Sequence, residues 1–167
     1  AMIIVRGGGD LATGTIYKLH QCGYDVLILE TDRPTAIRRK VAFCEAVYDS
    51  AAAVEDVVCR RVDTMEQCRA TWKKGEIPLM VDPDGEWIEK WRPDAVIDAI
   101  LAKKNLGTHR GMAPLTIALG PGFCAGTDGG AVYPGAAGGC GSGTLPDSVG
   151  PFSPVPSGLW GLGGRSG

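Results

Sequence analysis

Residues 2–14 read MIIVRGGGDLATG, an apolar run that breaks into three glycines and continues with helix-favouring residues. The pattern predicts a strand, a tight turn and a helix. Its G-x-G-x-x-G/A spacing lets the first glycine form the turn, the second admit a pyrophosphate, and the small third residue pack helix on strand. N–H groups at the start of the helix would then face the phosphate. The residues expected to bind a nucleotide here are Gly7, Gly8, Gly9, Asp10 and Ala12.

The residues after the turn strengthen this interpretation. A helical stretch over residues 11–22 is followed by Gly23, and a second apolar run over 26–29 ends at Glu30. Glu30 lies about 20 residues past the glycines, where a dinucleotide-binding unit places the acid that holds a ribose hydroxyl. The alternative is a βαβ unit whose glycines only form the turn and whose Glu30 is a solvated strand end.

Further apolar runs follow at 77–82, 95–100 and 115–119, separated by segments with helical or turn character. Thr64 or Asp63 is expected to cap a helix that runs to about residue 74. Alternating strands and helices indicate a sheet that is mostly parallel and buried on both faces. The predicted fold class is α/β, a Rossmann-like three-layer fold.

Three shorter segments carry separate expectations. Residues 57–62 are rich in β-branched side chains and predict a small inserted strand or hairpin, with 50–53 as a connection before it. Residues 46–48 are a short strand candidate. Pro34 suits the first turn of a helix that carries Arg38 and Arg39.

A parallel sheet binds ligands beyond the carboxyl ends of its strands, at the point where the strand order reverses. Besides Glu30, the residues at such ends are Asp82, Gly120 and Gly122, which we expect to contribute to the binding site. Asp82 is equally explained as a turn or helix cap. Asp98 lies within an apolar strand, where its carboxylate needs a partner, either Lys103, Lys104 or a backbone donor.

Composition limits the classes of function. With 167 residues, a net charge of -2 and 44% hydrophobic residues, the chain can bury one core and lacks the basic excess of nucleic-acid-binding proteins. No apolar run approaches the roughly 18 residues that span a bilayer, so we expect a cytoplasmic protein without a membrane partner. The six cysteines show no metal-ligand spacing and are expected to be reduced, mostly core residues, so no metal site is predicted.

Several segments together carry a resemblance to a family. They are residues 4–14, 30–39, 41–49, 98–105 and 113–128, which in this order resemble the YqeB-type accessory proteins of selenium-dependent molybdenum hydroxylases. The resemblance implies a cytoplasmic bacterial protein that acts in maturation of the hydroxylase or its molybdenum cofactor, with those maturation proteins as partners. It carries over no catalytic residue, so the catalytic residues are unknown.

The resemblance stops after Asp128. Residues 129–167 hold 13 of the 25 glycines and 5 of the 11 prolines, and their only charged side chains are Asp147 and Arg165. Such a composition predicts an irregular tail, residues 129–167, after a Rossmann-like nucleotide-binding domain over residues 1–128. Relatives are expected to continue with ordinary composition, so the abrupt change suggests a reading-frame change or an altered expressed gene, which sequencing that gene would decide.

Three functions remain open from the sequence. The first is a nucleotide-binding accessory protein whose ligand is NAD or another pyrophosphate-containing nucleotide, including the dinucleotide form of the molybdenum cofactor. The second is an NAD-dependent oxidoreductase, for which His109 is the candidate proton donor. The third is a non-catalytic adaptor for the hydroxylase or a selenium donor, in which the glycine loop is only structural.

Overall fold

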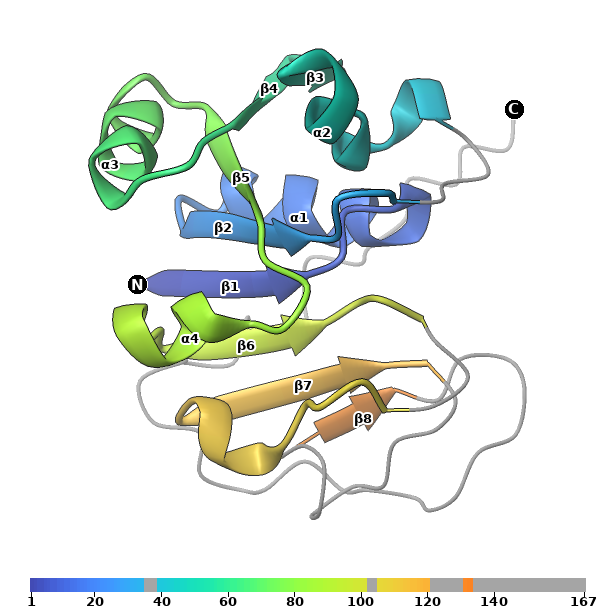
Figure 1. The fold of residues 1–167 in the computed structure, drawn as a ribbon, viewed down its shortest axis with the longest axis vertical. Helices are drawn as coiled ribbons and strands as arrows, with labels where there is room; N and C mark the ends of the chain where they lie inside the picture. The colour runs from blue at the N-terminus through green and yellow to red at the C-terminus, as the bar shows by residue number, and fades with distance from the viewer. Residues whose placement is uncertain (35–38, 102–104, 121–130, 134–167) are drawn as a thin grey trace, which may run out of the picture.

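A single mixed sheet organises the computed structural model, which describes residues 1–34, 39–101, 105–120 and 131–133. Within these residues the sheet has eight strands in the order β3-β4-β5-β2-β1-β6-β7-β8 (Figure 1). All neighbouring strands are parallel except the antiparallel β3–β4 hairpin. The strands are β1 (Met2–Arg6), β2 (Asp25–Glu30), β3 (Ala51–Val54), β4 (Val57–Arg61), β5 (Ile77–Val81), β6 (Ala95–Asp98), β7 (Leu115–Leu119) and β8 (Ala131–Tyr133).

Without the hairpin, the strand order is that of a Rossmann fold. The strands β5-β2-β1-β6-β7-β8 follow the pattern 3-2-1-4-5-6, counted in the order in which the chain forms them. The order reverses at β1, which pairs with β2 on one side and β6 on the other. The predicted α/β, Rossmann-like fold with a mostly parallel sheet is confirmed, and so is the inserted hairpin, which extends the sheet beyond β5.

Helices cover both faces of the sheet, as the apolar strands require. The helical segments are α1 (Asp10–Gln21), η1 (Arg39–Val41), η2 (Phe43–Glu45), α2 (Ala46–Asp49), α3 (Met65–Lys73), α4 (Glu86–Trp91) and η3 (Arg110–Met112). Residues of α1, η2 and α2 pack in one buried cluster with Val5 and Ile28. Residues of α3 and α4 pack on the other face with Ile4 and Leu29. The alternation along β1 thus sends successive side chains into two separate cores.

Helix α3 begins where the sequence predicts. The Thr64 hydroxyl accepts from the Gln67 N–H at 3.2 Å, and the Gln67 side chain reaches back to the Thr64 N–H. This reciprocal pair is a capping box, and it satisfies two backbone donors that the first turn leaves without helical partners.

The structure differs from the sequence expectation at three places. Residues 46–48 belong to helix α2 and not to a strand, because Ala46 and Val47 are both buried by one helical turn that ends at Ser50, whose φ is 66°. The expected connection at 50–53 is largely the edge strand β3. The third difference is the end of β6, which ends at Asp98, two residues before the predicted end.

The remaining expectations fall partly beyond the described residues. Strand β8 lies within the segment expected to be irregular, where Ala131, Val132 and Tyr133 form a short apolar interruption of the glycine-rich composition and pair in parallel with β7. Residues 35–38, including Arg38, lie outside the described residues, and Arg39 begins the single 3-10 turn η1. In the part of the chain that the structure describes, no helix has the length and apolar character to cross a membrane.

Candidate functional site at the carboxyl end of β1

The turn after β1 is fixed by contacts with both neighbouring strand ends. The Gly7 N–H donates to the Leu29 carbonyl oxygen at 2.8 Å, and the Gly7 φ of +94° lies in the left-handed region. A Cβ atom at Gly7 would lie 3.0 Å from the Ala99 carbonyl oxygen. Both the backbone angle and the close approach therefore require glycine at the position where the sheet order reverses.

Glu30 and Gly8 are brought together as the sequence predicts. The Gly8 N–H donates to the Glu30 Oε2 atom at 2.7 Å, and the Thr31 N–H donates to Oε1 at 2.8 Å. The carboxylate therefore lies against the glycine turn, at the end of β2. The Gly8 N–H is therefore occupied by the Glu30 carboxylate in this structure.

Thr13 holds the glycine turn from inside helix α1. Its hydroxyl lies 2.7 Å from the Gly9 carbonyl oxygen, to which it donates, and it accepts from the Phe43 N–H at 3.1 Å. The Cys44 N–H donates to the Gly8 carbonyl oxygen at 2.9 Å. The segment after β2 is thus attached to the back of the turn. Sequence reasoning missed this role, because a helical threonine that bonds four residues back leaves no distinctive pattern.

The front of the turn is open as far as the described residues are concerned. None of them lies within 4 Å of a Cβ atom built on Gly9, which is the N-cap residue of α1. Asp10, in the first helical turn, is partly exposed, and Ala12 is buried against the sheet at 1% exposure. Gly9 therefore presents backbone and the start of a helix to an approaching ligand, while Ala12 provides the close helix–strand packing that the motif predicts.

The other predicted residues are arranged differently. Both carboxylate oxygens of Asp82 accept backbone N–H groups, from Gly85 at 3.0 Å and from Trp87 at 2.9 Å. Asp82 therefore stabilises the start of α4, the structural alternative for this residue. Gly120 lies at the end of β7, where a Cβ atom would be 3.3 Å from the Leu101 side chain. Gly122 lies outside the described residues.

A cluster of buried polar side chains, which sequence reasoning did not predict, lies next to the turn. Arg6 is 2% exposed and Asp98 is 1% exposed, with 3.9 Å between Nη1 and Oδ2. Thr108 connects them, since its hydroxyl accepts from Arg6 Nη1 at 2.6 Å and donates to Asp98. Arg6 Nη2 also donates to the carbonyl oxygens of Pro83 and Leu106, both at 3.2 Å.

The sequence marks Asp98 as a residue that needs a partner but does not identify Arg6 as that partner. Arg6 and Asp98 are opposite charges at the ends of two apolar strands, and strand pairing places them in register. Of the predicted partners, the backbone donor is present, because the Ile100 N–H donates to Asp98 at 3.0 Å. Lys103 and Lys104 lie outside the described residues.

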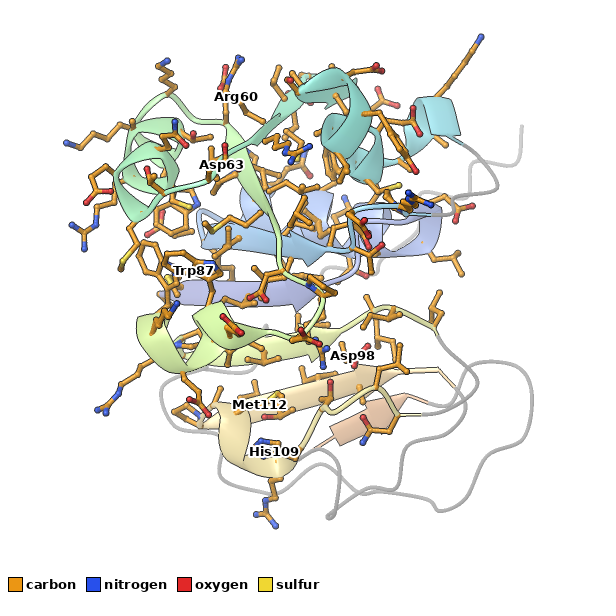
Figure 2. The ribbon with its side chains drawn as sticks, viewed as in Figure 1. Arg60, Asp63, Trp87, Asp98, His109 and Met112 are labelled. Atoms are coloured by element: carbon orange, nitrogen blue, oxygen red, sulfur yellow. The ribbon has the colours of Figure 1, made fainter. Side chains whose placement is uncertain are left out.

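His109 belongs to a different part of the molecule. Figure 2 shows His109 and Met112 on the segment that passes in front of β7. Both line a cleft of about 1360 Å³ whose other wall is formed by residues 84–94. Of the residues predicted to bind a nucleotide, none that the structure describes lines this cleft. The His109 Nδ1 atom accepts from the Gly111 N–H at 3.2 Å, so this ring caps η3.

Two buried cysteines, Cys59 and Cys68, have thiols whose pKa is raised by burial. Burial raises the pKa of the Cys68 thiol to about 12, and burial with the nearby Cys44 raises the pKa of Cys59 further still. Both thiols are therefore protonated at neutral pH. Within the described residues, no three His, Cys, Asp or Glu side chains gather in a group that could hold a metal ion.

The chain is similar to a bacterial protein named "Uncharacterized protein YqeB" from Escherichia coli strain K12. The two are 46% identical over 127 residues, which is 76% of this chain and 24% of the relative. This identity supports a YqeB-type protein, as the sequence resemblance implies. The chain spans about a quarter of the length of that relative. No family model and no solved structure matches the chain.

Proposed function

We propose that this YqeB-type chain binds a pyrophosphate-containing nucleotide at the turn formed by Gly7, Gly8 and Gly9, and that it serves as an accessory protein in maturation of a selenium-dependent molybdenum hydroxylase or its cofactor. The observation that carries the binding proposal is the position of the glycine turn. It follows the central strand β1, where a Rossmann strand order reverses and where such sheets bind nucleotides.

The glycine turn supplies the chemistry that a pyrophosphate needs. Gly9 is open to an approaching ligand, and the N-terminus of the 12-residue helix α1 provides N–H donors and a positive dipole end. Asp10 and Glu30 add negative charge near this position. The phosphate is therefore expected at the Gly9 backbone, away from the Gly8 N–H that Glu30 occupies and with the Asp10 carboxylate turned from it.

Glu30 suits a ribose hydroxyl and disfavours a phosphate. A hydroxyl can donate to the carboxylate while the Gly8 N–H bond is retained, whereas a 2′-phosphate would meet like charge. NAD and the dinucleotide form of the molybdenum cofactor both present a pyrophosphate with attached ribose, so both remain candidate ligands.

The first prediction concerns Gly9. Gly9→Val places a branched side chain where the pyrophosphate must approach, and we expect nucleotide binding to weaken by about tenfold or more, roughly 1.4 kcal/mol. Isothermal titration calorimetry with NAD and a cytidine dinucleotide measures this. Gly14→Val is the matched control, because it makes the same change within α1, at a glycine where an added Cβ atom also meets none of the described residues within 4 Å. If the unmodified protein binds none of these nucleotides, the proposal is wrong.

The second prediction concerns cofactor choice. If the ligand is a nicotinamide dinucleotide, NAD should bind more tightly than NADP, because Glu30 repels the 2′-phosphate. Competition titration compares the two. Glu30→Gln should reduce the difference in affinity between NAD and NADP, because it removes the negative charge of the side chain. A preference of the unmodified protein for NADP would contradict the role of Glu30 and would indicate pairing with the exposed Arg33.

The maturation role has its own test. In a bacterium that carries this protein and such a hydroxylase, deletion of the gene should lower the molybdenum or selenium content of the purified hydroxylase, measured by elemental mass spectrometry. Complementation with the Gly9→Val variant should fail to restore that content, whereas the Gly14→Val variant should restore it. Unchanged metal and selenium content after deletion would contradict the maturation role while leaving nucleotide binding intact.

A further inference from the structure

Leu101, which follows strand β6, combines two properties that are unfavourable for a leucine. Its φ is +60°, in the left-handed region where a β-carbon crowds the backbone, and its side chain is 38% exposed. Among the described residues, three other non-glycine residues have a positive φ, and all are polar or charged. Ser50 and Arg92 end helices, and Glu55 lies in the β3–β4 hairpin, where left-handed residues are common. Leu101 instead follows a strand.

Two glycines define where Leu101 lies. Strands β1, β6 and β7 are parallel and in register, so Gly7, Leu101 and Gly120 follow the same edge of the sheet (Figure 1). A Cβ atom on Gly7 would lie 3.1 Å from the Ile100 Cα atom. A Cβ atom on Gly120 would lie 3.3 Å from the Leu101 Cδ2 atom and 3.4 Å from its Cα atom. The segment after β6 therefore runs from the glycine turn to Gly120, and Leu101 packs on the Gly120 backbone.

Leu101 and Glu30 lie on opposite sides of the glycine turn. Strand β1 pairs with β2, which ends at Glu30, and with β6, which precedes Leu101. A ligand whose ribose meets Glu30 and whose pyrophosphate lies at Gly9 therefore directs its second half away from β2, toward the end of β6. The residues there are Ala99, Ile100 and Leu101, whose apolar side chains suit a planar ring better than a further phosphate.

We propose that the exposed side chain of Leu101 contacts the ring of the second nucleoside, or of the group in its place, when a dinucleotide binds at the glycine turn. The inference rests on the proposed nucleotide binding and names its ligand class, a dinucleotide rather than a nucleoside diphosphate. Strained residues persist where the surrounding structure holds them, and they concentrate at ligand sites. Because Gly120 already holds one side of Leu101, little side-chain freedom is lost when the ring arrives.

A matched pair of variants tests the contact. In Leu101→Ala, we expect NAD to bind about fivefold more weakly or worse, whereas ADP, which lacks the second nucleoside, should bind within about twofold of its original affinity. Leu106→Ala removes the same side chain from another exposed leucine of the same connection and should change neither affinity. Isothermal titration calorimetry measures all of these, and the cytidine dinucleotide with CDP forms a second pair of probes.

Leu101→Gly separates a ligand contact from a packing role. Glycine adopts this φ without strain, which offsets the lost contact with Gly120, so the midpoint of thermal unfolding should change little while the affinity for NAD falls as in Leu101→Ala. A large fall of the midpoint together with equal losses for NAD and ADP would overturn the proposal, by showing that Leu101 serves the fold.

The unmodified protein provides the last distinction. Binding of the dinucleotides no tighter than that of ADP or CDP would overturn the inference about Leu101 and leave nucleotide binding at the glycine turn intact. Unchanged affinity for the dinucleotides in Leu101→Ala would have the same consequence. Binding of none of the four compounds would refute the proposed binding function itself, and the inference about Leu101 with it.

Discussion

The glycine turn follows directly after Arg6, which belongs to the buried cluster of Arg6, Asp98 and Thr108, the Arg6 cluster. The turn and the cluster use their polar groups in different ways. The turn leaves space at Gly9, where a Cβ atom would meet none of the described residues within 4 Å. One residue before the turn, Arg6 is 2% exposed, and its guanidinium bonds to Thr108 and two carbonyl oxygens. The comparison teaches that two kinds of polar group at this strand end differ in role. The buried side chains hold the loops in place, whereas space for a ligand is left at Gly9 and the start of α1.

Breaking the Arg6 cluster should have the largest effect. Arg6→Met leaves Asp98 buried without its cation and removes donors from Thr108, Pro83 and Leu106, so we expect a loss of about 3–5 kcal/mol in the free energy of unfolding. Urea denaturation measures it. The double variant Arg6→Met with Asp98→Leu removes both charges and should recover part of the loss. A single variant that loses less than about 1 kcal/mol would show that the cluster does not hold the loops.

Within the glycine turn, the two outer glycines should differ. Gly7→Ala introduces a left-handed non-glycine residue and a contact of 3.0 Å with the Ala99 carbonyl oxygen, so we expect a loss of about 2 kcal/mol or more. Gly9→Ala meets open space and should cost less than about 1 kcal/mol. Thermal and urea unfolding of the two variants side by side would make this comparison. Equal losses would mean that both glycines serve the fold and that neither is kept for a ligand.

The smallest effect on stability is expected at the exposed ion pair of Arg60 and Glu76. This pair serves as a reference for the buried pair of Arg6 and Asp98. Arg60 Nε lies 2.7 Å from Glu76 Oε2, closer than Arg6 is to Asp98, yet Arg60 is 44% exposed. The hydrogen bond from Arg60 lowers the pKa of Glu76 below its ordinary value of 4.5. Its stabilising contribution is therefore present above the unfolded-state pKa and is lost as the pH falls through the lower pKa of the folded state.

Unfolding curves of Glu76→Gln and the unmodified protein between neutral pH and pH 3 check this reference pair. The two proteins should differ slightly at neutral pH and converge in acid, because solvent screens an exposed pair. A difference as large as that of Arg6→Met would show that burial is not what separates the two pairs.

Local patterns predicted much of the fold and part of the site. The glycine spacing and the acid at the end of the second strand predicted that the turn and Glu30 would lie together, and their hydrogen bond confirms it. The capping residues of α3 were also readable, because a capping box is a relation between residues three apart. Predictions were weakest for short segments such as residues 46–48, whose helical state depends on burying Ala46 and Val47 against distant strands.

What the sequence determined by itself were properties of near neighbours: the apolar strands, the glycine turn and the alternation that divides β1 between two cores. Only the tertiary structure decided which strands are adjacent, and hence that Arg6 meets Asp98 and Thr108. The physical reason is that these relations depend on strand order and crossover direction, which bring together residues as far apart as Arg6 and Thr108. Hydrophobic periodicity predicts each strand separately and does not specify the order of the strands in the sheet.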